Sequence, residues 1–187
     1  MKIKILFKFN NLIMKIAITG KMCSGKSTIA NMITQIDNSF IKIAFADKIK
    51  ELAIDLFNME TKDRDLLINI GTKFREIDRD VWINYVIKKT SDNKNYILDD
   101  LRFQNELDIL VKHGWIIIDL DVLYVDQISR IKKLYPNNYE NHIKNMNHIS
   151  EQKKLDYKYN GPILQFNTSK DEFYKIKHNL VLLLNKK

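Results

Sequence analysis

The sequence predicts a single domain of the α/β class, built in three layers with a parallel sheet of about five strands between helices. Short apolar runs alternate with helical patterns along the chain, which is typical of repeated strand–helix–strand units. One run contains Ile116, Ile117 and Ile118 in succession, as expected of a strand that is covered on both faces. The length of 187 residues and the 45% hydrophobic content suit one domain with a proper core.

The expected elements follow the apolar patterns in chain order. The expected strands span 14–19, 40–45, 96–98, 115–120 and 163–166. The expected helices span 27–35, 47–57, 63–90, 103–111, 126–134 and 171–184. The polar run Asp78 to Asp80 predicts a bend in the long third helix. Residues 136–147 are polar and rich in asparagine, and we expect them to be mobile.

The first clean strand begins at Met14, where proteins with this pattern commonly start. We interpret residues 1–13 as an N-terminal extension or a start-site artefact, and residues 14–187 as the domain. The segment before Met14 is apolar and basic, but Lys4 and Lys8 interrupt it and no small-residue cleavage site follows. No run of about 18 apolar residues is present, so we expect no membrane span.

The net charge of +8 and the pI near 9.4 favour anionic partners. The chain is also heavy in Lys, Asn and Ile, which an AT-rich genome gives to any protein. No helix-turn-helix, zinc-finger or RNA-binding signature is present, so a nucleic-acid partner is disfavoured. The single cysteine, Cys23, excludes an intramolecular disulfide and fits a reducing compartment, for which we expect the cytoplasm.

The strongest motif is Gly20-Lys21-Met22-Cys23-Ser24-Gly25-Lys26-Ser27, which matches the phosphate-binding pattern G-x-x-x-x-G-K-[ST], the P-loop. A chain of this length matches by chance on the order of once in a hundred cases. The motif follows a strand and opens a helix, which is the context it requires. We therefore expect backbone N–H groups and the helix N-terminus to hold a nucleoside triphosphate, ATP, together with Mg²⁺.

Each residue of the motif has an expected role. Lys26 reaches the β- and γ-phosphates, and Ser27 places its hydroxyl on Mg²⁺. The expected nucleotide-binding residues are Gly20, Lys21, Cys23, Ser24, Gly25, Lys26, Ser27 and Thr28.

A small-molecule kinase is the P-loop class that the rest of the chain favours. No N/T-K-x-D guanine motif is present, and motors and helicases usually need a longer chain. An acceptor hydroxyl would call for a carboxylate base. An acceptor phosphate is largely ionised near neutrality, because its second pKa is about 6, and it calls for arginine instead.

Arginine is informative because the chain prefers lysine. The sequence has Arg64, Arg75, Arg79, Arg102 and Arg130. Arg102 follows the expected strand 96–98 and the pair Asp99-Asp100, at the strand end where magnesium-directing carboxylates lie in this class. We expect one of the two acids, Asp100, to order Mg²⁺ directly or through water, and Arg102 to face the phosphates being joined.

Beyond the P-loop, four segments resemble the deoxynucleoside monophosphate kinases of large DNA viruses and bacteriophages. They match the patterns F-A-D-x-[LI]-K, G-T-x-x-R with D-x-W, D-x-R-F-x-N-E and H-x-S-E. In this chain they begin at Phe45, Gly71 (with Asp80-Val81-Trp82), Asp100 and His148. The ordered matches run from Met14 to about Phe166. Lys48 and Gln104 stand where proline is common in the family.

The resemblance implies an adenylate-kinase-like core, ATP, Mg²⁺ and a deoxynucleoside monophosphate acceptor. It implies an acceptor-binding helical region at about 46–92, lined by Asp47, Arg75, Trp82 and Arg102, and a small helical lid at about 126–150. Asp47 would bond the nucleotide, or else only cap a helix, and Trp82 would pack on its base or sugar. Arg130 would be the lid arginine that reaches the transferring phosphoryl group. A viral origin would place the protein in the host cytoplasm.

Two other readings stay open. One is a kinase of another small phosphorylated acceptor, of the dephospho-coenzyme A or phosphomevalonate type. The other is a P-loop protein that binds nucleotide or nucleic acid without small-molecule chemistry. The accepted bases, the sugar type and the oligomeric state, a homodimer included, are not fixed by the sequence.

Overall fold

The computed structural model describes residues 13–146, 155–157 and 162–185. One parallel sheet lies at its centre, with the strand order β2-β3-β1-β4-β5. The strands are β1 (Lys15–Gly20), β2 (Phe40–Ile43), β3 (Asn95–Leu101), β4 (Ile116–Asp121) and β5 (Ile163–Asn167). The predicted parallel sheet of five strands is confirmed.

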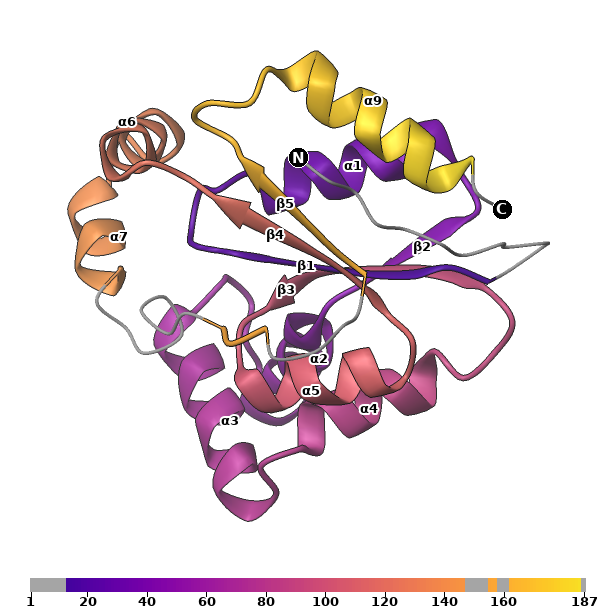
Figure 1. Cartoon of the computed structure of the whole chain (residues 1–187). Helices are drawn as coiled ribbons and strands as arrows, with labels where there is room; N and C mark the ends of the chain where they lie inside the picture. The colour runs from indigo at the N-terminus through magenta and orange to yellow at the C-terminus, as the bar shows by residue number, and fades with distance from the viewer. Residues whose placement is uncertain (1–12, 147–154, 158–161, 186–187) are drawn as a thin grey trace.

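Helices cover both faces of the sheet (Figure 1). One face carries α1 (Lys26–Ile36) and α9 (Phe173–Leu184). The other carries α2 (Phe45–Phe57), α4 (Val81–Lys89) and α5 (Gln104–Lys112), with α3 (Arg64–Ile77) beside α2 and α4. The order of layers is therefore the three-layer arrangement that the sequence predicts.

Each face of the sheet has its own apolar core. Successive side chains of a strand point to opposite faces. In β1, Ile16 and Ile18 join the cluster under α1 and α9, while Ala17 joins the cluster under α2, α4 and α5. All three are fully buried, which explains why the strands read as continuous apolar runs.

The break predicted near 78–80 is confirmed, because α3 ends at Ile77 and α4 begins at Val81. Two other expectations are corrected. α2 begins at Phe45 rather than at 47, because Asp47 Oδ2 accepts the N–H of Ala44 and so caps the first turn from within. The segment 136–147, expected to be mobile, contains helix α7 (Tyr139–Asn145).

Helix α7 packs on α6 (Tyr124–Leu134) and is held there by an aromatic contact. The rings of His142 and Tyr135 stack with their centroids 3.7 Å apart. Composition alone did not reveal this pairing, because asparagine-rich segments lack helical periodicity. In Figure 1, α6 and α7 lie beside the carboxyl ends of the strands, where the P-loop also lies.

Parts of the expected organisation lie outside the described residues. These are residues 1–12 of the N-terminal segment and the H-x-S-E segment, 148–151. Within the described residues, no helix is both long enough and apolar enough to cross a membrane.

Candidate functional site

The P-loop joins β1 to α1, and glycine is required at both of its ends. Gly20 has φ +143°, and a Cβ there would lie 2.5 Å from the carbonyl oxygen of Leu120. Gly25 has φ +100° and occupies the N-cap of α1 without a side-chain cap. No side-chain cap therefore competes with an anion at the start of α1, where the helix dipole adds a partial positive charge.

Lys26 holds its charge inside the loop. Its Nζ donates to the carbonyl oxygens of Gly20, at 2.7 Å, and Lys21, at 2.8 Å. The side chain is buried, so the ammonium group is fixed beside the loop backbone rather than spread through solvent. This is the position from which a lysine can neutralise a polyphosphate chain.

Three successive carbonyl groups of the loop accept hydrogen bonds from side chains outside the loop. Met22 O accepts from Gln127 Nε2 at 2.9 Å, and Cys23 O accepts from Arg130 Nη1 at 3.1 Å. Ser24 O accepts from Thr168 Oγ1 at 2.9 Å. A trans peptide directs C=O and the next N–H oppositely, so the N–H groups of Cys23 and Gly25 face the other side. The braces thus orient N–H groups as an anion cradle requires.

Gln127 and Thr168 were missed by the sequence reasoning. Both lie far from the motif in sequence, on α6 and after β5, and no pattern marks them. Gln127 is fully buried, and a buried glutamine has to find hydrogen-bond partners. A glutamine among otherwise apolar inward positions of a helix was the only available signal.

Arg130, the expected lid arginine, binds the P-loop and the residue that follows β5 in this structure. Besides the Cys23 carbonyl, its guanidinium donates to Thr168 Oγ1 at 2.9 Å and to Thr168 O at 2.8 Å. It thereby ties α6 to the P-loop and to the loop after β5. In this conformation Arg130 braces the cradle, and its expected contact with the transferring phosphoryl group stays a prediction.

The remaining P-loop residues divide by exposure. Lys21, Ser27 and Thr28 are exposed, so their side chains are accessible to a ligand. Ser24 is fully buried, with its hydroxyl against Gly20, and it can contribute only through its backbone. Cys23 has φ +59°, in the left-handed region. Cys23 occupies one of the four positions between the two glycines at which the motif accepts any residue.

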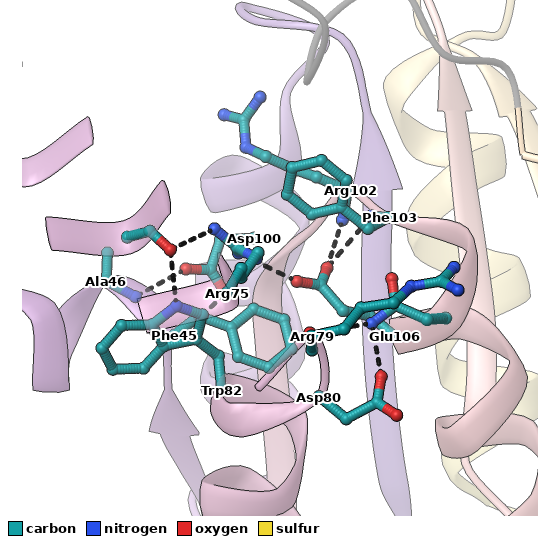
Figure 2. Close-up of polar contacts among 12 residues, drawn as sticks. Phe45, Ala46, Arg75, Arg79, Asp80, Trp82, Asp100, Arg102, Phe103 and Glu106 are labelled. Carbon is teal, nitrogen blue, oxygen red and sulfur yellow. Dashed lines mark hydrogen bonds and ion pairs between the residues drawn. The ribbon is translucent and has the colours of Figure 1, made fainter. Parts of the chain in front are cut away.

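Asp100 connects β3 to the start of α2. Its Oδ1 accepts the N–H of Phe45 at 3.1 Å and its Oδ2 accepts the N–H of Ala46 at 3.0 Å (Figure 2). Burial raises the pKa of this carboxyl to about 6, although the two N–H groups act in the opposite direction. The neighbouring Asp99 lies 3.6 Å from Lys42 Nζ.

The expected Mg²⁺ residues fit a metal to different degrees. Ser27 presents an exposed hydroxyl in the first turn of α1, as the role requires. Both oxygens of Asp100 already accept N–H groups, so its contribution through an ordered water stays a prediction. Within the described residues, no group of three or more His, Cys, Asp or Glu side chains could hold a metal. Mg²⁺ needs no such group when phosphates and waters supply most of its ligands.

Two of the predicted acceptor residues, Arg75 and Arg102, share a partner at the turn between β3 and α5. Glu106 joins them: its Oε1 accepts from Arg75 Nη2 at 3.2 Å, and its Oε2 accepts the backbone N–H of Arg102 at 3.1 Å. The Phe103 N–H donates to the same Oε2 at 3.0 Å. Figure 2 shows the Arg102 side chain directed away from the carboxylates of Asp100 and Glu106. Glu106 was not predicted as a site residue, although its place three residues after the helix start was a visible capping signal.

Trp82 lies in the apolar core, and its predicted contact with a base or sugar stays a prediction. It is 3% exposed, its ring lies 5.4 Å from the Phe74 ring, and its Nε1 donates to Gly71 O at 3.0 Å. Gly71 O also accepts from Arg75 Nη1 at 3.1 Å. Trp82 therefore supports the helix that carries Arg75. Asp47 is exposed and caps α2, which leaves its contact with a nucleotide a prediction.

The sheet order, the glycine loop and the arginine-bearing turn together define a P-loop fold of the kinase type. Solved structures agree. A sugar kinase from Janibacter sp. matches with TM-score 0.56 and 14% identity, over 92% of this chain and 95% of that one. Shikimate kinase from Aquifex aeolicus matches with TM-score 0.54 and 16% identity, over 92% and 96%. A gluconokinase from Sinorhizobium meliloti matches with TM-score 0.54 and 11% identity, over 95% and 94%.

These likenesses establish the fold. No protein-family model matches the sequence, and no curated protein sequence matches it either.

Proposed function

We propose that this chain is a kinase that transfers the γ-phosphoryl group of ATP to the phosphate of a small acceptor, a deoxynucleoside monophosphate. The observation that carries the proposal is the placement of two arginines at the carboxyl end of β3, where the Arg75 guanidinium and the backbone N–H of Arg102 bind the same carboxylate, Glu106. Paired arginines suit a phosphate acceptor, because guanidinium groups bind phosphate oxygens in a bidentate manner.

The acids at this turn support a phosphate acceptor rather than a hydroxyl. A hydroxyl acceptor needs a carboxylate to take its proton. Here Asp99 lies beside Lys42, Asp100 accepts two backbone N–H groups, and Glu106 binds Arg75. A phosphate acceptor needs no base, since its attacking oxygen is mostly ionised at neutral pH.

In the proposed reaction, an oxygen of the acceptor phosphate forms a bond to the γ-phosphorus as the bond to the β–γ bridging oxygen breaks. The products are ADP and the acceptor diphosphate. The loop N–H groups and Lys26 stabilise the charge that spreads over the phosphoryl oxygens. Mg²⁺, with Ser27 as its expected protein ligand, would neutralise part of the same charge.

The deoxynucleotide acceptor rests on the resemblance of the Phe45, Gly71 and Asp100 segments to viral and phage enzymes. The fold neighbours are named for shikimate, gluconate and sugars, so other acceptors belong in the test. A panel of deoxy- and ribonucleoside monophosphates, dephospho-coenzyme A, phosphomevalonate, shikimate and gluconate, assayed by coupled ADP release, identifies the acceptor. Turnover with a nucleoside monophosphate above all others is expected. ADP release that needs only DNA or RNA would contradict the proposal.

The matched variants are Lys26→Ala and Lys177→Ala. Lys26→Ala should lower kcat at least about 100-fold, the scale of losing one group that stabilises transition-state charge. Lys177 is exposed on α9, on the face of the sheet opposite α2, α4 and α5, and its replacement should leave the rate unchanged.

A further inference from the structure

Glu106 is a buried carboxylate that contacts both arginines of the candidate acceptor site. It is 1% exposed and lies in the first turn of α5. One of its oxygens binds the side chain of Arg75, which comes from α3, and the other binds the backbone of Arg102 and Phe103 (Figure 2). Because α3 and the β3–α5 turn are far apart in sequence, this carboxylate is a direct link between them.

Burial makes this arrangement costly unless the charge is fully paired. Removing a carboxylate from water raises its pKa, and burial is the main cause of the raised pKa of Glu106. Two backbone N–H groups and the Arg75 guanidinium counteract that effect. A capping role alone would be met by the two N–H groups, so the bond to Arg75 is an addition to it.

The guanidinium of Arg75 is constrained from three directions. Its Nη1 donates to Gly71 O, its Nη2 donates to Glu106, and its Cζ lies over the Phe103 ring, 4.5 Å from the ring centre. Among the described residues, these bonds use two of its five N–H donors, which leaves donors for an anion. The side chain is 25% exposed, so an anion can approach it. A guanidinium group that is already held in place loses little further conformational entropy when it binds an anion.

We propose that Glu106 is the positioning residue of the acceptor site: it fixes the Arg75 guanidinium against the β3–α5 turn, so that Arg75 faces the phosphate that Arg102 binds. This inference rests on the proposed function for the identity of the anion. Glu106 does not touch the acceptor; it acts through Arg75.

The test compares Glu106→Gln and Glu106→Asp with Glu76→Gln in the full chain. Glu76 is exposed on α3, next to Arg75, and pairs with Lys73. Rates are measured with the acceptor varied at saturating ATP and with ATP varied at saturating acceptor. Glu106→Gln should raise the acceptor KM about tenfold, the effect of losing one hydrogen bond to a charged group. The ATP KM should stay within about twofold, since no contact joins Glu106 to the P-loop among the described residues.

The two other variants sharpen the result. Glu106→Asp keeps the charge, so it should raise the acceptor KM less than Glu106→Gln does. Glu76→Gln should change neither the acceptor KM nor the ATP KM. Arg75→Lys should also raise the acceptor KM, and Glu106→Gln should add less than about twofold to it, because both changes remove the same interaction. Equal rises in both KM values, or independent effects of the Arg75 and Glu106 changes, would overturn the inference. If Glu106→Gln does not fold, the same cycle with Glu106→Asp and Arg75→Lys decides.

Failure of the proposed function is distinguishable from failure of this inference. If the wild-type chain phosphorylates no nucleoside monophosphate, the variants are titrated with inorganic phosphate by calorimetry on a Lys26→Ala background, which weakens competition from the P-loop. Phosphate binding about tenfold weaker with Glu106→Gln supports the positioning role. Equal affinity, or no binding by either protein, overturns it.

Discussion

The two tryptophans offer a sharp test of the core beside the candidate acceptor site. Trp82 and Trp115 are both buried, at 3% and 1% exposure. Trp82 Nε1 donates to Gly71 O, whereas Trp115 Nε1 has no hydrogen-bond partner among the described residues. Replacing each with phenylalanine removes a similar part of the ring. Only at Trp82 does the change also remove a hydrogen bond.

The expected magnitudes differ accordingly. Trp82→Phe loses a hydrogen bond of about 1 kcal/mol and buried ring contacts of about another 1 kcal/mol. A loss of about 2 kcal/mol lowers Tm by about 4–8 °C in a chain of this size. Trp115→Phe loses ring contacts but also removes a buried N–H without a partner, which offsets the cost, so its Tm should change by about 2 °C or less.

Thermal unfolding followed by circular dichroism measures both variants, and the acceptor KM is measured alongside. Trp82→Phe should leave this KM within about twofold, because Arg75 keeps its bonds to Gly71 and Glu106. Equal Tm shifts for the two variants would refute the hydrogen-bond reasoning. An unchanged Tm with a large rise in the acceptor KM would show that the Trp82 ring faces a ligand.

Two further predictions concern the P-loop and the α6–α7 pair. Gly20→Ala should abolish measurable ATP binding or folding, because its Cβ would lie 2.5 Å from Leu120 O. Gly114 has φ +77° and open space around it. Gly114→Ala should therefore retain ATP binding, at a stability cost of about 1–2 kcal/mol. Calorimetry and thermal unfolding of both variants check this, and normal ATP binding by Gly20→Ala would contradict it. Burial, then Arg64 and Lys62, lower the pKa of His142 below 6.5, so the folded state favours the neutral ring. Its contribution to stability should be full above pH 6.5 and be lost as the pH falls toward the folded-state pKa. The pH dependence of unfolding should be weaker in His142→Phe, and an identical dependence in the two proteins would exclude this role.

The anion cradle of the P-loop could be predicted because the spacing of its glycines and its lysine in the sequence determines the backbone geometry of the loop. Gly20, Gly25 and Lys26 stand where a strand must turn sharply into a helix, and the structure gives both glycines positive φ angles. The sheet was predictable for a similar reason, since strands buried on both faces read as unbroken apolar runs such as Ile116 to Ile118.

The supports of the cradle were not predictable in the same way. Gln127, Arg130 and Thr168 reach the P-loop only because α6 and the loop after β5 fold back against it. Trp82 had a motif match but no signal for its direction, which depends on how α4 packs against α3. Glu106 read as part of a matched segment, and only the structure shows that its carboxylate binds Arg75.

Binding of ATP with Mg²⁺ to the purified chain tests the central claim most directly. Isothermal titration calorimetry should show one site per chain, with ADP as a competitor and with Lys26→Ala weakening the affinity at least about tenfold. Absence of heat and of any thermal stabilisation at millimolar ATP would contradict the account, because the loop N–H groups and Lys26 would then not form a polyphosphate site.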